Sequence, residues 1–143
     1  MSESIHLKII SAGVEFTAVE IKELYIPAYY GQAGILENHL PFITMLGFGE
    51  VSYKDINDRK HYLFVDGGFL ENRNNKIFLL ADELELGEDL DRHSINERLS
   101  EVELTIKSAL KGDISPDELE KKIKEQKALR SKLDIIDKLD KGN

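Results

Sequence analysis

The sequence predicts an α+β protein: an N-terminal antiparallel β-sandwich over residues 1–84, followed by a C-terminal antiparallel two-helix hairpin over residues 85–143. Three observations predict this division. All 11 tyrosines and phenylalanines precede residue 79, and most of the ten glycines precede residue 88. Short apolar runs interrupted by turn residues every eight to twelve positions are typical of an antiparallel sandwich. Beyond residue 88, apolar residues recur at helical spacing instead.

The first strands follow from alternation. Residues 5–9 alternate apolar and polar side chains, as in a half-buried strand. The parity of the apolar positions shifts between Ile21 and Leu24, which predicts a β-bulge or a bend. Pro27 cannot donate a hydrogen bond within a sheet, so this strand is expected to end there or to lie at an edge.

Two continuous apolar runs, residues 62–65 and 77–80, are too short for helices and are predicted to be core strands. Polar hairpin connections are expected at residues 55–60 and 72–75. The pair Gly67-Gly68 predicts a sharp corner or a close approach of two backbones, because glycine tolerates conformations that other residues avoid.

The first predicted helix opens with acidic residues at positions 88–91, which complement the helix dipole in the first turn. Lys111 and Gly112 are expected to close it, with Gly112 in a left-handed conformation. Its apolar stripe is formed by Ile95, Leu99, Val102, Ile106, Ala109 and Leu110.

The second predicted helix has a clear start, because Ser115, Pro116 and Glu118 match an N-cap, a first-turn proline and a capping-box acid. Its apolar stripe is thin and shifts around the helix. We therefore expect this helix to be weakly docked and a candidate for movement. The stripe comprises Leu119, Ile123, Ala128, Leu129, Leu133, Ile136 and Leu139.

Composition excludes several classes of function. The chain has 143 residues, 41% of them hydrophobic, no cysteine and a formal net charge of −8. A thiolate metal site, a disulfide framework and a cysteine nucleophile are therefore excluded. The acidic balance argues against binding to a nucleic-acid backbone. No apolar run is long enough for a membrane span, and the first residues do not match a signal peptide.

No catalytic constellation is evident. The four histidines are far apart in sequence, so no metal site is expected. Residues 31–34 superficially resemble a phosphate loop, but a close turn between strands is the better interpretation because no Lys-Ser/Thr follows. His93 and Ser94 are interpreted as a helix-surface pair. His39 lies in a predicted loop, where a structural role in the turn and a contact with a partner both remain open.

The order of these features resembles the epsilon subunit family of F-type ATP synthases. The resemblance spans nearly the whole chain and rests on a combination of segments. Residues 30–44 resemble the family's Gly-x-x-Gly-Ile and Gly-His-x-Pro stretch, and residues 66–71 resemble its Gly-Gly-x-x-Glu corner. Residues 7–12 and 79–82 resemble the family's first strand and the end of its last strand.

The resemblance implies a non-catalytic subunit of a proton- or sodium-transporting ATP synthase. Its sandwich would bind the gamma subunit and the c-ring in the central stalk. Its C-terminal helices would reach the alpha/beta hexamer and inhibit ATP hydrolysis. The implied location is peripheral, on the cytoplasmic face of a bacterial inner membrane or on an organelle inner membrane. The alternative is a stand-alone nucleotide-sensing or adaptor module of the same architecture.

The resemblance also implies two sets of partner-binding residues. Gly31, Gln32 and Ala33 match the family segment that faces the c-ring, although the family often has an acid where Gln32 stands. His39 matches a histidine close to the gamma contact. The complete set of partner-binding residues is Tyr30, Gly31, Gln32, Ala33, Asn38, His39, Leu40 and Pro41.

A nucleotide site is implied only in part. Leu90 and Asp91 match the start of the family motif Ile/Leu-Asp-x-x-Arg-Ala, but Ser94 stands where the motif has arginine. Arg130 resembles a second family arginine that contacts the nucleotide. Losing one charge-assisted phosphate contact costs roughly 1.5–3 kcal/mol, and Arg92 lies about 200° around the helix from Ser94. We therefore expect ATP binding to be weak or absent, with no other cofactor.

Overall fold

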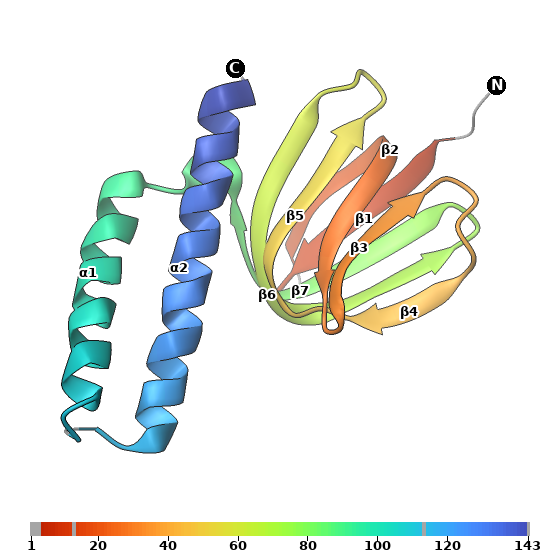
Figure 1. The fold of residues 1–143 in the computed structure, drawn as a ribbon. Coiled ribbons are helices and arrows are strands. Elements are labelled where there is room, and N and C mark those ends of the chain that lie inside the picture. Colours follow the sequence, from red (N-terminus) through yellow and green to blue (C-terminus); the bar gives the residue numbers. More distant parts are fainter. Residues whose placement is uncertain (1–3, 13, 113, 143) are drawn as a thin grey trace. The chain divides into compact units, whose positions relative to one another are not determined.

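A computed structural model describes residues 4–12, 14–112 and 114–142. The chain divides into two compact units, one ending at Gly87 and one beginning at Glu88. The first unit is an antiparallel-rich β-sandwich and the second is a pair of antiparallel helices (Figure 1). The described strands are β1 (Ile5–Ser11), β2 (Val14–Ala28), β3 (Gly31–Leu36), β4 (Phe42–Met45), β5 (Phe48–Asp55), β6 (Lys60–Arg73) and β7 (Lys76–Leu86). The helices are a 3₁₀ turn (Gly87–Asp89), α1 (Arg92–Ala109) and α2 (Pro116–Gly142).

The sandwich is built from long strands that belong to both of its layers. The sheet order is β1-β7-β6-β5-β2-β3, β4 pairs with β6, and β1 also pairs with β2, so the sheet returns to its first strand. The first half of β2 pairs with β1, whereas its second half pairs with β3 and β5. Likewise, one half of β6 pairs with β5 and the other half with β4.

The corners between the layers lie where the sequence predicted irregularities. The register of β2 against β5 shifts between Ile21 and Glu23, which confirms the predicted bulge. In β6 the corner is Gly67-Gly68, with φ angles of 81° and 124°. A Cβ atom on Gly68 would lie 1.9 Å from the carbonyl oxygen of Leu80, so only glycine fits there. The predicted close approach is confirmed.

Alternate residues of the strands fill the space between the layers. β1 shows this pattern, because Leu7 and Ile9 are fully buried while His6 is exposed. The hairpin turns at residues 56–59 and 74–75 also lie where predicted, and both asparagines of the second turn have positive φ. The resulting core comprises Ile5, Leu7, Ile9, Ile21, Leu24, Ile26, Ala28, Ile35, Leu46, Val51, Tyr53, Leu63, Val65, Leu70, Ile77, Leu79 and Ala81.

The helical unit has the predicted hairpin form, with corrected ends. Ser115 Oγ accepts a hydrogen bond from the Glu118 backbone N–H at 3.2 Å, which confirms the N-cap of α2. Gly112 has a φ of 84°, as expected after a helix end. The first turn of α1 was misplaced, because positions 88–89 form a 3₁₀ turn and Asp91 is the N-cap. Leu110 is exposed and does not belong to the buried stripe.

Three other expectations about the sandwich need correction. The predicted domain boundary between residues 84 and 85 falls inside β7, which continues to Leu86 because its last residues pair with β6. Residues 31–34 form strand β3 paired with β2, and the turn lies one step earlier at Tyr29 and Tyr30. The run 77–80 is not wholly buried, because Phe78 points outward between Ile77 and Leu79.

Candidate functional site

The predicted partner-binding residues fall into two groups at opposite ends of β3. Residues 30–33 include the turn and the start of this strand, whereas residues 38–41 follow its end. The six residues of β3 span about 17–20 Å at roughly 3.3 Å per residue. The structure therefore does not bring the eight residues together, and instead places them on two separate surfaces.

The first surface, the β2–β3 turn, is aromatic and well anchored. The exposed rings of Tyr29 and Tyr30 contact each other edge-to-face, with centroids 5.2 Å apart. The Tyr29 N–H donates to the Met45 carbonyl oxygen at 3.0 Å, which ties the turn to the end of β4. Gln32 and Gly31 are exposed at the start of β3, and Gln32 lies opposite Pro27. The turn therefore offers a fixed polar and aromatic surface to a partner.

The second surface, the β3–β4 loop, is held by asparagines. The Asn38 N–H donates to the Asn75 side-chain oxygen at 2.7 Å, and Asn75 Nδ2 donates back to the Asn38 side chain at 3.1 Å. Buried Asn72 donates to the carbonyl oxygens of His39 and Leu40 at 3.3 Å each. Asn72 and Asn75 thus fix the β3–β4 loop without covering the side chains of the loop.

His39 takes part in the loop and is also exposed. Its ring lies 4.9 Å from the Phe42 ring, and its Nδ1 atom is 2.9 Å from the Leu40 carbonyl oxygen. Leu40 and Pro41 beside it are exposed. These contacts give His39 a structural role in the loop and leave its ring accessible to a partner, so the two predicted roles are compatible.

Sequence reasoning missed an exposed apolar surface, which we call the β4 face. On it, Ile43 is 70% exposed, Met45 65%, Phe69 44% and Phe78 41%. Large apolar patches on a protein surface mark interaction surfaces more often than isolated exposed residues do. The β4 face comprises the exposed Ile43, Met45, Phe69 and Phe78 and the half-buried Ile10 and Leu80.

The pairing register joins four residues of the β4 face into one row, whereas Glu71 lies between Ile43 and Phe78. Met45 lies opposite Phe69, Phe69 opposite Leu80, and Leu80 opposite Ile10, so one apolar row crosses four strands. In the strand 42–45 the structure buries Thr44, so the residues on both sides of it, Ile43 and Met45, point outward. The residue types alone do not show that Thr44 is the buried one, so the outward orientation of Ile43 and Met45 was not predicted.

The β4 face connects the two predicted surfaces. β4 begins directly after the β3–β4 loop and ends beside the β2–β3 turn, where Met45 accepts the hydrogen bond from Tyr29. Ala28 and Leu46 form a further bridge at the same end. The sandwich thus has an aromatic turn at one end, an asparagine-held loop at the other, and an apolar surface between them.

The residues of the implied nucleotide motif have local structural roles. Asp91 caps α1, accepting hydrogen bonds from the Ser94 N–H at 3.3 Å and the Ser94 hydroxyl at 2.5 Å. The Ser94 hydroxyl bond is the main reason why the pKa of Asp91 is lowered. Leu90 is packed against the buried residues of the hairpin. The serine that replaces the motif's arginine therefore completes a helix cap.

Arg130 does not join Leu90 and Asp91. Its Nη2 atom lies 3.4 Å from Glu103 of α1. Glu103 is about a dozen residues along the chain from Asp91, or roughly 18 Å of helix at about 1.5 Å per residue. Arg92 is also engaged, because its guanidinium contacts Asp137 and Asp140 at 2.9 and 3.0 Å. These two carboxylates raise the pKa of Arg92.

Within the described residues, no cluster of potential ligands suitable for a metal ion is found. None of the helices there has the length and apolar character needed to span a membrane.

Comparison with known proteins agrees with the sandwich. Residues 4–87 match the family model described as the ATP synthase delta/epsilon chain, β-sandwich domain. The chain belongs to this family. The delta/epsilon match covers the first unit and ends where the helical unit begins.

Relatives in the delta/epsilon family include the ATP synthase epsilon chain of Nitratidesulfovibrio vulgaris Miyazaki F, which is 37% identical over 91 residues, covering 64% of this chain and 67% of the relative. The epsilon chain of Dichelobacter nodosus is 34% identical over 108 residues, covering 76% of each chain. A chain of the Euglena gracilis mitochondrial ATP synthase shares the fold, with a TM-score of 0.68 at 18% identity, over 97% of this chain and 81% of that one.

Proposed function

We propose that the chain is the epsilon subunit of an F-type ATP synthase and works in the central stalk, where its sandwich couples the gamma subunit to the c-ring. The observation that carries the proposal is the delta/epsilon match across the entire sandwich. Curated relatives aligned over about two thirds of their length are epsilon chains. The subunit itself is non-catalytic and contributes to ion-coupled ATP synthesis through its position.

The separation of the predicted surfaces suits a coupling role. We assign the β2–β3 turn, with Tyr30, Gly31, Gln32 and Ala33, to the c-ring. The β3–β4 loop, with Asn38, His39, Leu40 and Pro41, and the adjoining β4 face are assigned to gamma. An apolar surface of this kind provides binding energy, while a close-packed interior resists deformation when two partners pull on opposite ends.

The helical unit is assigned a regulatory role. Its two helices inhibit ATP hydrolysis by contacting the alpha/beta hexamer, and they do so without a tightly bound nucleotide. Support for weak or absent ATP binding comes from Asp91, which is occupied as a helix cap, and from Arg130, which is paired with Glu103. The subunit is placed on the cytoplasmic face of a bacterial inner membrane, attached only through the complex.

The first test is affinity capture of the tagged chain from its own solubilised membranes, with mass spectrometry of the recovered proteins. We expect gamma, alpha and beta in stoichiometric amounts. Phe69→Ser on the β4 face should reduce gamma recovery by about tenfold or more, since it removes a central apolar contact. Ile56→Ser is the matched control, because Ile56 is also exposed but lies in the β5–β6 turn. Absence of all three subunits would overturn the proposal.

The regulatory assignment has its own test. A stop codon after Gly87 removes the helical unit at the boundary of the compact sandwich. ATP hydrolysis by complexes carrying the shortened subunit should rise about twofold or more over complexes with the full chain. Unchanged hydrolysis at equal incorporation would remove the inhibitory role and leave the stalk assignment intact. A calorimetric titration giving a low-micromolar ATP dissociation constant would contradict the expected weak binding.

A further inference from the structure

The apolar contact between α1 and α2 is thin. Only four residues are fully buried between helices of 18 and 27 residues, and the other apolar residues packed against them, Leu90, Leu99, Ile106 and Leu133, are partly exposed. Such a seam has far fewer buried contacts than a domain core. Polar interactions between the helices therefore contribute a larger part of the free energy that keeps the hairpin closed. The buried residues are Ile95, Val102, Leu129 and Ile136.

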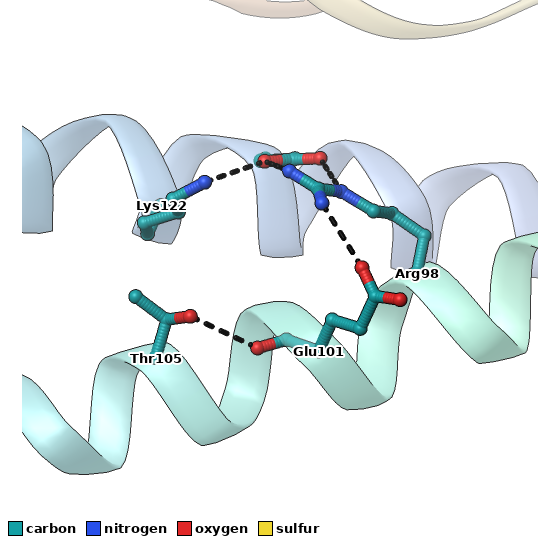
Figure 2. Close-up of polar contacts among 5 residues, drawn as sticks. Arg98, Glu101, Thr105 and Lys122 are labelled. Carbon is teal, nitrogen blue, oxygen red and sulfur yellow. Dashed lines mark hydrogen bonds and ion pairs between the residues drawn. The ribbon is translucent and has the colours of Figure 1, made fainter.

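Arginine–carboxylate pairs cross the hairpin beside this seam. Arg98 of α1 contacts Glu125 of α2 in a fork, with Nε 2.5 Å from one carboxylate oxygen and Nη2 3.0 Å from the other. Figure 2 shows that the same guanidinium also reaches Glu101 of its own helix, at 3.1 Å. Lys122 lies 3.7 Å from the Glu125 carboxylate. Two-point pairing of this type is the geometry in which an exposed ion pair contributes most.

A second pair lies on the other flank of the seam. Arg130 of α2 contacts Glu103 of α1. In each helix the two charged partners are five positions apart, which at about 100° per residue places them roughly 140° apart around the helix axis. The buried residues lie between them. The seam is therefore bordered by Arg98–Glu125 on one side and by Arg130–Glu103 on the other.

A third pair closes the end of the hairpin farthest from its loop. Arg92, in the first turn of α1, contacts both Asp137 and Asp140 near the C-terminal end of α2. The two acids lie three positions apart on one face of α2, so a single guanidinium bridges them. This end lacks a covalent connection between the helices, and the pair is placed where fraying would begin.

We propose that the ion pairs of Arg92, Arg98 and Arg130 between the helices, here called arginine clasps, form an electrostatic latch. The ionic strength of the medium then sets how often α2 separates from α1. Each exposed pair is weak alone and is screened by salt. All three join the same two helices, however, and opening the hairpin breaks all of them together. If the helical unit has the proposed regulatory role, the latch sets the fraction of subunits whose helices are separated.

The test uses the full chain labelled for interhelical distance measurement, which the absence of native cysteine makes direct. Ser100→Cys and Lys127→Cys place spin labels on exposed positions, one on each helix, that point away from the seam. Pulsed dipolar spectroscopy then reports the fraction of separated helices. Raising NaCl from about 50 mM to about 1 M should increase that fraction by about threefold or more.

Charge reversal sharpens the test. Arg98→Glu should increase the open fraction at low salt about fivefold, because it faces Glu125 and Glu101 with a like charge. Adding Glu125→Arg should restore part of the closure, with full restoration prevented by the like charges of Glu101 and Lys122. Lys121→Glu is the matched control, an equal charge change at an exposed α2 position outside the clasps, and should leave the distance unchanged.

The latch is overturned if the distance distribution is the same at both salt concentrations, or if Arg98→Glu and Lys121→Glu act alike. Circular dichroism at each salt concentration verifies that both helices stay intact. Because these measurements use the isolated chain, their failure would not affect the central-stalk assignment. Loss of gamma binding, in turn, would leave the latch standing.

Discussion

The β-sandwich and the helical hairpin are held together by different interactions. The sandwich buries a continuous core with residues from β1, β2, β3, β5, β6 and β7, against which the partly buried Phe42 of β4 packs, and its corner at Gly68 is close-packed. The hairpin buries a cluster of four residues between its helices, which arginine–carboxylate pairs border on both sides. The sandwich therefore keeps its shape through close packing, whereas the hairpin depends on interactions that solvent conditions can weaken.

The largest expected effect lies in the sandwich. Gly68→Ala should lower the free energy of unfolding by about 2–4 kcal/mol, because the new methyl group collides with the backbone of β7 and the residue has a positive φ. Gly47→Ala is the control from the same corner, since its added Cβ would meet Ala28 at an ordinary 3.5 Å. Urea denaturation compares the two variants. Equal stabilities would contradict the rigid-corner interpretation.

The second prediction compares the cores directly, with one fully buried valine from each unit. Val51 is 0% exposed in the sandwich and Val102 is 1% exposed in the hairpin. Val51→Ala should cost about 2 kcal/mol and Val102→Ala about 1 kcal/mol, because a two-helix seam collapses around a cavity more easily than a sandwich core does. Residue-resolved hydrogen exchange measures each loss. A larger loss of stability for Val102→Ala than for Val51→Ala would contradict the interpretation that the sandwich is the more rigidly packed unit.

The third prediction concerns the N-terminal cap of α1. Asp91→Ala removes the acceptor of both Ser94 hydrogen bonds. Amide exchange in the first turn of α1 should accelerate about threefold, with the sandwich unaffected. Asp89→Ala, in the preceding 3₁₀ turn, serves as the control. If ATP protected the wild-type amides against exchange but not those of Asp91→Ala, the capping residue would also be a nucleotide contact.

The smallest expected effect is a pH dependence of hairpin closure. The hydrogen bond from Arg98 holds the pKa of Glu125 below its ordinary value of 4.5. A lowered folded-state pKa stabilises the hairpin above pH 4.5, and this contribution is lost as the pH falls through the folded-state value. Acidification from about pH 6 to about pH 3 should therefore loosen the wild-type hairpin more than the Arg98→Gln variant. Identical pH profiles for the wild type and Arg98→Gln would contradict this role of the Arg98–Glu125 pair.

Much of the sandwich could be predicted from the sequence, because residues with strict backbone requirements mark the ends and corners of its strands. Pro27 stands one residue before the end of β2, and Gly68 marks the corner of β6. These residues reveal backbone geometry without any knowledge of the fold. The N-cap of α2 was also predictable, because Ser115, Pro116 and Glu118 together have the spacing of a capped helix start.

The candidate site was harder to predict, for two physical reasons. A strand with apolar residues on both faces does not reveal which face is buried, so the exposure of Phe78 depends on tertiary structure. A charged residue on a helix does not reveal whether its partner lies on the same helix or across a seam. The spacing of three predicts the contact of Arg98 with Glu101 on its own helix, whereas only the structure reveals its second contact, with Glu125 on the other helix.

The sharing of β2 and β6 between both layers has a mechanical consequence. A force applied between the β2–β3 turn and the β3–β4 loop is carried along continuous backbone. This force acts along β3, whose hydrogen bonds to β2 lie across that direction and are loaded together in shear instead of breaking one after another. The shared strand β2 then passes the load to β5 and β1. The sandwich can therefore act as a stiff spring, with a yield force that exceeds the strength of any single contact on its surface.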